Sequence, residues 1–223
     1  MLNLASYLDT TNLKPDAQWP DIERLCLDAI DYQMAAVCVH PCWIARAREV
    51  LAGSQVQLAA VVGFPLGANL SDTKIFEARR ALEDGATEID MVLNLAALTA
   101  GDYLLLEKEV RSMVSLKLDY PLVLKVIVET ALLNSRQLAD ITRYLGDWGA
   151  DYIKTSTGFA QRGVSLEDMQ VIRSNRGSAL KIKASGGIRT LDFALQLINA
   201  GADRLGTSQA MSLLREMEGR QSV

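Results

Sequence analysis

Residues 149–158 contain a joint between a helix and a strand, and they read Gly149-Ala150-Asp151-Tyr152-Ile153-Lys154-Thr155-Ser156-Thr157-Gly158. Gly149 stands where glycine commonly ends a helix. Tyr152 to Ser156 is predicted as a strand, so Lys154 shares a face with Tyr152 and Ser156, because strand side chains alternate. A lysine in a buried strand needs a partner or a function for its amine. Lys154 is therefore the first candidate for a functional residue.

The same joint occurs twice more, as Gly85-Ala86-Thr87 and Gly201-Ala202-Asp203. Short apolar, β-branched segments alternate with amphipathic ones along the chain, which indicates alternating strands and helices. The strands are predicted at Tyr7–Thr10, Ala35–His40, Leu58–Phe64, Glu88–Asn94, Leu122–Glu129, Tyr152–Ser156, Leu180–Ser185 and Arg204–Thr207. The helices are predicted at Asp21–Tyr32, Thr73–Asp84, Asp102–Leu118, Ser135–Trp148, Leu166–Arg176, Leu191–Asn199 and Gln209–Met217, with N-caps at Ser71, Ser135 and Ser165.

Eight strands that alternate with helices within 223 residues predict an α/β chain folded as a single (β/α)8 barrel, or TIM barrel, over residues 1–223. The alternative is a doubly wound open sheet, which usually has fewer strands and a glycine-rich first turn. The sequence contains no G-x-G-x-x-G or G-x-x-x-x-G-K motif, and no linker or low-complexity segment divides it. The barrel is therefore favoured.

Composition limits the functional classes. Hydrophobic residues make up 49% and charged residues 22% of the chain, the balance of a soluble globular protein. A net charge of -4 argues against nucleic-acid binding. No apolar run is long enough to cross a bilayer, and the N-terminus lacks the features of a signal peptide, so no membrane partner is expected. Three cysteines and one histidine form no metal-ligand pattern, so we expect reduced thiols in a cytoplasmic protein with neither metal nor other cofactor.

A second predicted strand repeats the arrangement around Lys154, because Lys183 stands just before Gly186-Gly187. Strand parity places six charged side chains inside the predicted barrel: Asp9, Asp90, Lys125, Glu129, Lys154 and Lys183. Charges in a barrel interior are costly to desolvate, so they indicate a functional site. The structural alternative is that Lys154 only pairs with Asp90 or Glu129. Lys125 and Glu129 are predicted to form a structural charge pair that lines the site.

These residues permit Schiff-base chemistry. Burial and the neighbouring charge of Lys183 favour the neutral amine of Lys154, which can attack an aldehyde or ketone. The resulting iminium withdraws electrons, so that an adjacent carbon–carbon bond can break or form. Proton transfers at each step need a carboxylate, and Asp90 is the best-placed candidate.

Glycine-rich segments after the predicted strands suggest an anion site. Gly186-Gly187 and Gly206-Thr207-Ser208 precede helices, so that backbone N–H groups and a helix dipole meet an anion there. Thr157-Gly158 adds a third set of donors. This is the usual place for a substrate phosphate in such barrels. A lysine that handles aldehydes beside this cradle suggests aldol chemistry on a phosphosugar, with phosphosugar and aldehyde as the small-molecule partners.

Six blocks of the chain resemble the deoxyribose-phosphate aldolase family, in order and over nearly the whole chain up to Ser208. They are Leu8–Lys14, Val61–Gly67, Glu88–Val92, Leu124–Thr130, Lys154–Phe159 and Lys183–Thr190. The resemblance implies a class I, metal-free aldolase that reversibly cleaves 2-deoxy-D-ribose 5-phosphate into acetaldehyde and D-glyceraldehyde 3-phosphate. By position, Lys154 matches the Schiff-base lysine, Lys183 its cationic neighbour, and Asp90 the proton-transfer aspartate. Gly158, Gly186, Gly187 and Ser208 match the phosphate loops.

The chain departs from the family pattern at Thr10, at His40 and in the segment Ala160-Gln161-Arg162-Gly163, which leaves substrate preference open. His40 is interpreted as a hydrogen-bonded wall residue. Cys38 shares its inward face and lines the pocket in this interpretation, where a free thiol is a candidate for reaction with aldehydes. Asp9 is a further candidate for the pocket lining.

Two alternative functions stay open: a Schiff-base aldolase acting on another phosphosugar, and a barrel that binds a phosphosugar without catalysis. Metal-dependent aldol chemistry is disfavoured, since the sequence offers no convincing ligand set. A homo-oligomer is possible on the sequence, but no residue decides it.

Overall fold

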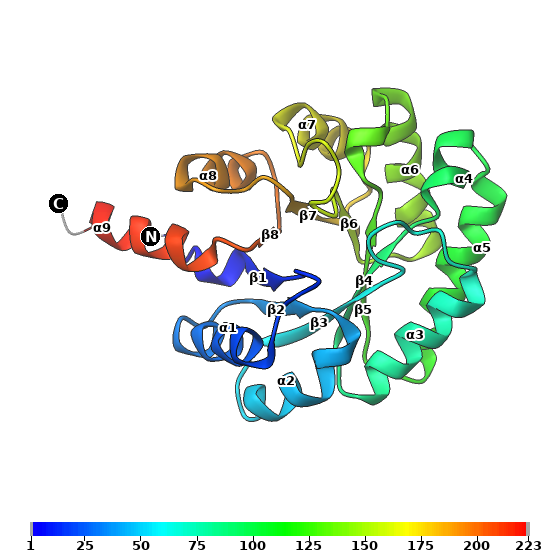
Figure 1. Ribbon diagram of the computed structural model, residues 1–223. Coiled ribbons are helices and arrows are strands. Elements are labelled where there is room, and N and C mark those ends of the chain that lie inside the picture. Colours follow the sequence, from blue (N-terminus) through cyan, green and yellow to red (C-terminus); the bar gives the residue numbers. More distant parts are fainter. Residues whose placement is uncertain (1, 222–223) are drawn as a thin grey trace.

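The computed structural model describes residues 2–221, so positions 1, 222 and 223 of the predicted domain lie outside the described residues. Eight parallel strands pair in chain order and close on themselves through β1 and β8, with helices around the outside (Figure 1). The predicted (β/α)8 barrel is thus confirmed. Its strands are β1 Leu8–Asn12, β2 Ala36–Val39, β3 Gln57–Val62, β4 Glu88–Val92, β5 Val123–Ile127, β6 Tyr152–Lys154, β7 Lys181–Ser185 and β8 Arg204–Thr207.

The helices form the outer ring that covers the apolar outer face of the barrel (Figure 1). Residues such as Ile89 and Met91 on β4 are fully buried between strand and helices, which is where the main core lies. The α-helices are α1 Trp19–Asp31, α2 Ile44–Leu51, α3 Ser71–Glu83, α4 Leu95–Ala100, α5 Tyr103–Val114, α6 Ser135–Trp148, α7 Leu166–Asn175, α8 Leu191–Asn199 and α9 Ala210–Gln221. Short 3-10 turns are η1 Ala5–Tyr7, η2 Pro41–Trp43, η3 Ser115–Leu118 and η4 Thr130–Leu132. Across residues 2–221, none of the helices is both long and apolar enough to span a bilayer.

The sequence analysis did not predict two of the helices, and one predicted helix consists of two separate elements. α2 has 8 residues and α4 has 6, too few to produce a clear helical period. The helix predicted over Asp102–Leu118 consists of α5 followed by the 3-10 turn η3. β1 lies two residues further along at its C-terminal end than predicted, at Asn12 rather than Thr10.

One of the three predicted N-caps is confirmed. The Ser165 side chain accepts a hydrogen bond from the Asp168 N–H at the start of α7. The N-caps predicted at Ser71 and Ser135 are wrong, because each serine is already the first residue of its helix. At α6 the preceding Asn134 takes the role, since its side chain accepts from the N–H of Gln137 at 2.9 Å. Adjacent polar residues offer the same capping chemistry, so the sequence does not choose between them.

The repeated Gly-Ala-Thr/Asp joint closes one end of the barrel. Gly149 has a φ of 93° and ends α6 in the left-handed region. Two residues on, the Asp151 carboxylate accepts from the Leu124 N–H at 2.7 Å. Asp203 accepts in the same way from Ile182 at 2.8 Å. The Thr87 hydroxyl accepts from the N–H of Leu58 at 3.2 Å. The joint therefore fastens each strand to its predecessor at the N-terminal end, opposite the rim where loops carry function.

Candidate active site

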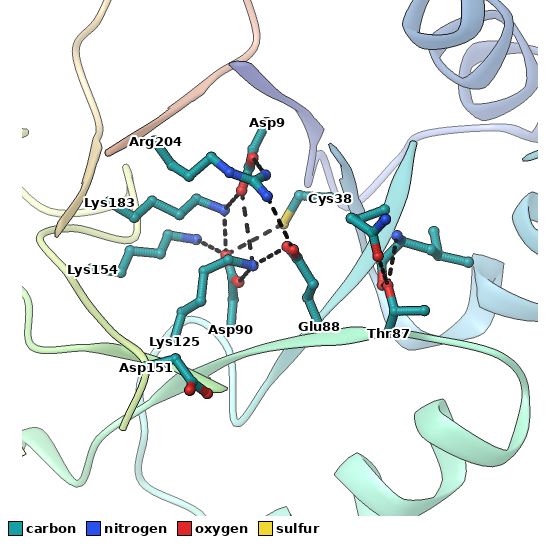
Figure 2. A network of polar contacts seen from close by, with 12 residues as sticks. Asp9, Cys38, Thr87, Glu88, Asp90, Lys125, Asp151, Lys154, Lys183 and Arg204 are labelled. Carbon is teal, nitrogen blue, oxygen red and sulfur yellow. Dashed lines mark hydrogen bonds and ion pairs between the residues drawn. The ribbon is translucent and has the colours of Figure 1, made fainter. Parts of the chain in front are cut away.

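Strand parity and parallel register bring the charged side chains into one interior network. Lys125 of β5 stands beside Asp90 of β4, and Lys183 of β7 stands between Lys154 of β6 and Arg204 of β8. Their side chains point toward one another across the barrel (Figure 2). The network comprises Asp9, Glu88, Asp90, Lys125, Lys154, Lys183 and Arg204.

Asp90 is the centre of this network. Its Oδ2 accepts from the Nζ of Lys154 and from the Nζ of Lys183, both at 2.7 Å, and its Oδ1 accepts from Lys125 at 2.8 Å. Burial by itself would raise the pKa of the Asp90 carboxyl, but the three lysines, led by Lys125, bring it well below the usual range. Asp90 is thus a carboxylate that touches the amine of Lys154.

Lys183 is held as a permanent cation. Its Nζ lies 2.5 Å from Asp9 and 2.7 Å from Asp90, and its side chain is fully buried. Burial alone would lower the pKa of Lys183, but the attraction of Asp9 and then of Asp90 raises it well above its ordinary value. A lysine with a fixed positive charge near Lys154 is the neighbour that the sequence analysis expected.

Charge balance singles out Lys154. Within the network, the three carboxylates Asp9, Glu88 and Asp90 face four cations, an excess of one positive charge. Lys125, Lys183 and Arg204 each contact two carboxylates closely. Among the described residues Lys154 has only Asp90, which it shares with two other lysines. Lys154 is therefore the network cation with the fewest ionic contacts.

The predicted pairing of Lys125 with Glu129 is wrong. Lys125 contacts Glu88 and Asp90 instead. Residues four apart on one strand lie roughly 13 Å apart, so sharing a face does not bring their side chains together. Glu129 lies beyond the end of β5, where its Oε2 accepts from the N–H of Thr157 at 3.1 Å and from the Thr157 hydroxyl.

Glu88 and Arg204 belong to the network although the sequence analysis did not select them. Arg204 lies 2.5 Å from Asp9 and 3.3 Å from Glu88. For Glu88 a signal was present, since it stands two residues before Asp90 and therefore shares its face. For Arg204, at the start of the last strand, the only signal in the sequence was its charge.

Cys38 and His40 lie on β2 and just after it. The Cys38 thiol is fully buried and lies 3.7 Å from Asp90 Oδ2. Burial, followed by the negative charge of Asp90, raises the pKa of this thiol, which disfavours the thiolate that would attack an aldehyde. His40 is half-buried, with its Nε2 3.2 Å from the carbonyl oxygen of Leu13, in agreement with the hydrogen bond expected for it.

The loops that follow β6, β7 and β8 line a cavity of about 650 Å³ above the network. It contains all the residues proposed from sequence for an anion site: Thr157, Gly158, Gly186, Gly187, Gly206, Thr207 and Ser208. Lys154 also lines this cavity, so the amine and the loops share one space. Sequence reasoning gave no role to two cations in the lining, Lys14 and Arg189, although both stand within blocks that it had selected.

The burial of Asp9 leads to a prediction about acid stability. Burial would raise its pKa, but the surrounding cations, led by Lys183, lower it from 3.8 to about 2. A depressed pKa in the folded state contributes stability above about pH 4 that is lost as the pH falls through about 2. We expect the free energy of unfolding to fall by about 2 kcal/mol over this window through Asp9 alone.

Denaturant unfolding at several pH values between 5 and 2 measures this loss. The Asp9→Asn variant is the control, because it lacks the titrating group and should show a shallower decline. An equally steep decline in Asp9→Asn would contradict the assignment of this acid sensitivity to Asp9.

Comparison with known proteins agrees with this geometry. The model of the family described as DeoC/LacD family aldolase matches residues 5–217. A curated relative from Caldicellulosiruptor saccharolyticus, named deoxyribose-phosphate aldolase, is 45% identical over 214 residues, which are 96% of this chain and 97% of the relative.

Two solved structures have nearly the same fold. An aldolase called QR15 superposes with a TM-score of 0.93 at 39% identity, covering 99% of this chain and 98% of its own. A tetrameric deoxyribose phosphate aldolase from Aeropyrum pernix gives a TM-score of 0.90 at 34% identity, covering 96% and 91%.

Proposed function

The chain belongs to the DeoC/LacD family of aldolases, and we propose that it acts as a deoxyribose-phosphate aldolase through a Schiff base on Lys154. Its substrate would be 2-deoxy-D-ribose 5-phosphate, cleaved reversibly to acetaldehyde and D-glyceraldehyde 3-phosphate. The names of the relatives support the substrate class. The network and the cavity above it support the mechanism.

One observation carries the proposal: Lys154 belongs both to the charged network and to the cavity lining. The other network members named above are absent from the described lining, so Lys154 is the amine that a substrate in the cavity can reach. A reactive amine must be neutral at the moment of attack. Lys154 is the network cation with a single carboxylate partner, in a network that has one more cation than it has carboxylates.

The reaction then runs through the nitrogen of Lys154. The neutral amine adds to the aldehyde carbon C1, and loss of water from the carbinolamine gives an iminium. The bond between C2 and C3 breaks as the C3 hydroxyl loses its proton, and the bonding electrons pass to the iminium to form an enamine. Glyceraldehyde 3-phosphate leaves, the enamine takes a proton at C2, and water releases acetaldehyde.

Asp90 is positioned for the proton transfers at Lys154. Its Oδ2 lies 2.7 Å from Lys154 Nζ, a distance suited to direct transfer. Lys183 shares this oxygen, so it opposes the positive charge on Lys154 before attack and holds Asp90 in place afterwards. Lys183 itself is bound too tightly by two carboxylates to act as the nucleophile.

The loops after β6, β7 and β8 are proposed to bind the phosphate. Gly158, Gly186 and Gly187 adopt positive φ values of 88°, 82° and 75°, a conformation that suits glycine, and they line the cavity. Lys14 and Arg189 at the rim add positive charge on the approach to this cradle.

Borohydride reduction in the presence of 2-deoxyribose 5-phosphate or acetaldehyde, followed by peptide mass spectrometry, tests the proposal. We expect one stable adduct, on the peptide that contains Lys154. An adduct on another lysine would keep the reaction class but overturn the assignment of the nucleophile. Folded protein that gives no adduct would refute Schiff-base catalysis.

Broader properties follow as proposals from the family. We propose that residues 1–223 form one aldolase domain that works without metal or cofactor. The tetrameric relative from Aeropyrum pernix supports a homo-oligomer. The three cysteines are all free thiols, which suits a cytoplasmic protein.

A further inference from the structure

We propose that Arg162 is a positioning residue, which holds the loop between β6 and α7 against the loop between β7 and α8 and so sets the affinity for the substrate phosphate. The inference rests on the proposed function and assigns a role to the segment Ala160–Gly163. Arg162 is not among the described residues that line the cavity, so it acts through the residues that do.

Arg162 joins the loop to two neighbouring elements. Its Nη1 donates to Asp168 Oδ2 at 2.6 Å and its Nη2 to Asp168 Oδ1 at 3.1 Å, a two-pronged contact with the first turn of α7. The same Nη2 donates to the carbonyl oxygen of Thr130 at 3.0 Å, in the connection after β5. Nη1 also donates to the carbonyl oxygen of Gly163 at 2.9 Å, which fixes the end of the loop itself.

Asp168 is a firm anchor for this guanidinium. Its side chain is only 9% exposed, and it also accepts from the Thr130 hydroxyl at 2.9 Å and from the Ser165 N–H at 3.0 Å. Thr130 is thereby bound to both members of the ion pair, through its hydroxyl and its carbonyl oxygen. The pair consequently ties the end of the loop to the structure behind β5.

The start of the loop is tied to the same place. Glu129, which directly precedes Thr130, accepts from the backbone N–H of Thr157 at 3.1 Å. The Thr157 hydroxyl in turn accepts from the N–H of Phe159 at 3.1 Å. Glu129 adopts a φ of 50°, a left-handed conformation that is uncommon for a residue other than glycine. The loop is therefore held at both ends on Glu129 and Thr130.

The residues next to Arg162 contact the opposite phosphate loop. A Cβ atom on Gly163 would lie 2.0 Å from the carbonyl oxygen of Gly186, so the two backbones meet without space for a side chain. The N–H of Val164 donates to the carbonyl oxygens of Ser185 and Gly186 at 3.2 and 3.3 Å. Movement of the loop after Arg162 would thus displace Gly186, which lines the cavity.

The effect of losing Arg162 should be confined to binding of the substrate phosphate. The loops supply backbone N–H groups to an anion, and such groups bind well only when they are held in place beforehand. Lys154 and Asp90 belong to the separate network inside the barrel, which Arg162 does not contact among the described residues. Loss of Arg162 should therefore weaken binding of phosphorylated substrates and spare the amine chemistry.

The test compares Arg162→Ala, Arg162→Lys and a matched control, Arg143→Ala. Arg143 also bridges two elements, since it donates to Asp140 and to Asn175 at 2.5 Å each, but it lies on α6 away from the loop. Cleavage of 2-deoxyribose 5-phosphate and of unphosphorylated 2-deoxyribose is measured, together with the Kd for inorganic phosphate by titration calorimetry. Thermal unfolding of each variant checks that the barrel persists.

We expect Arg162→Ala to raise the KM for the phosphorylated sugar and the phosphate Kd about tenfold, while kcat/KM for 2-deoxyribose changes less than about twofold. Arg162→Lys should lie between, because an ammonium cannot reproduce the two-pronged contact. Arg143→Ala should leave the KM for the phosphorylated sugar, the phosphate Kd and the kcat/KM for 2-deoxyribose unchanged.

Equal losses on both sugars, or no loss in Arg162→Ala, would overturn the inference. Calorimetry tests the role of Arg162 independently of the proposed catalytic function. If the wild-type protein cleaves neither sugar, the proposed function fails, and the phosphate Kd values still decide the role of Arg162. A wild-type protein that binds no phosphate would overturn the inference directly.

Discussion

Lys154→Ala is expected to abolish cleavage of 2-deoxyribose 5-phosphate, lowering kcat by a factor on the order of 10^4 or more, because Lys14, the other lysine in the described lining, lies outside the network. The fold should persist. Truncation of Lys154 removes the surplus positive charge, so that three carboxylates face three cations. We therefore expect a Tm close to that of the wild-type protein.

Kinetics and thermal unfolding measured on the same preparations check this prediction. Lys181→Ala is the matched control, because Lys181 stands two residues before Lys183 on β7 but is exposed and does not belong to the network. It should retain activity. Near-normal cleavage by a folded Lys154→Ala variant would refute the central assignment, and a large drop in its Tm would contradict the charge argument.

Lys183→Met is expected to lower kcat by a factor on the order of 10^2 to 10^3 and to move the acid limb of the pH profile to higher pH. Lys183 has a pKa well above its ordinary value, so it stays charged throughout the working range. Its stabilising contribution is present below the unfolded pKa and is lost only in strong alkali. The shift would therefore come from the loss of the charge repulsion that Lys183 exerts on the Lys154 amine.

The measurement is kcat/KM between about pH 6 and pH 10, with borohydride trapping of Lys154 at each pH. Removing one partner from a buried ionic network costs about 3 to 5 kcal/mol of stability, so unfolding must be followed in parallel. Lys125→Met provides the comparison, since it also removes a buried cation next to Asp90. A rate loss with an unchanged pH profile would mean that Lys183 serves the structure alone.

The barrel itself was predictable from the sequence. Alternation of period two placed Asp90 and Lys125 inside and Ile89 and Met91 outside, and the structure confirms each of these faces. The boundaries of α6 and α8 were also predicted to the residue. These features depend on local chemistry, such as side-chain alternation, helix-ending glycines and the solubility of each face, which neighbouring residues determine.

The contact partners of the charged side chains in the site were not predictable from the sequence. The sequence placed Lys125 and Glu129 on one face, yet Lys125 binds Glu88 and Asp90 while Glu129 holds Thr157. The choice depends on strand register and on the level at which each side chain enters the barrel. Neither quantity is encoded in the periodicity of a single strand.

The role of Lys154 depends both on the sequence and on the tertiary structure. Sequence was sufficient to identify it as a buried lysine beside glycine-rich loops, since composition and order within one strand carry that signal. That Lys154 alone has a single carboxylate partner within the network follows from contacts between β1, β4, β5, β7 and β8. The position of Arg162 likewise depends on Asp168 and Thr130, which lie on other elements. Charge balance and loop position are properties of groups brought together from distant segments, and only the closed barrel brings them together.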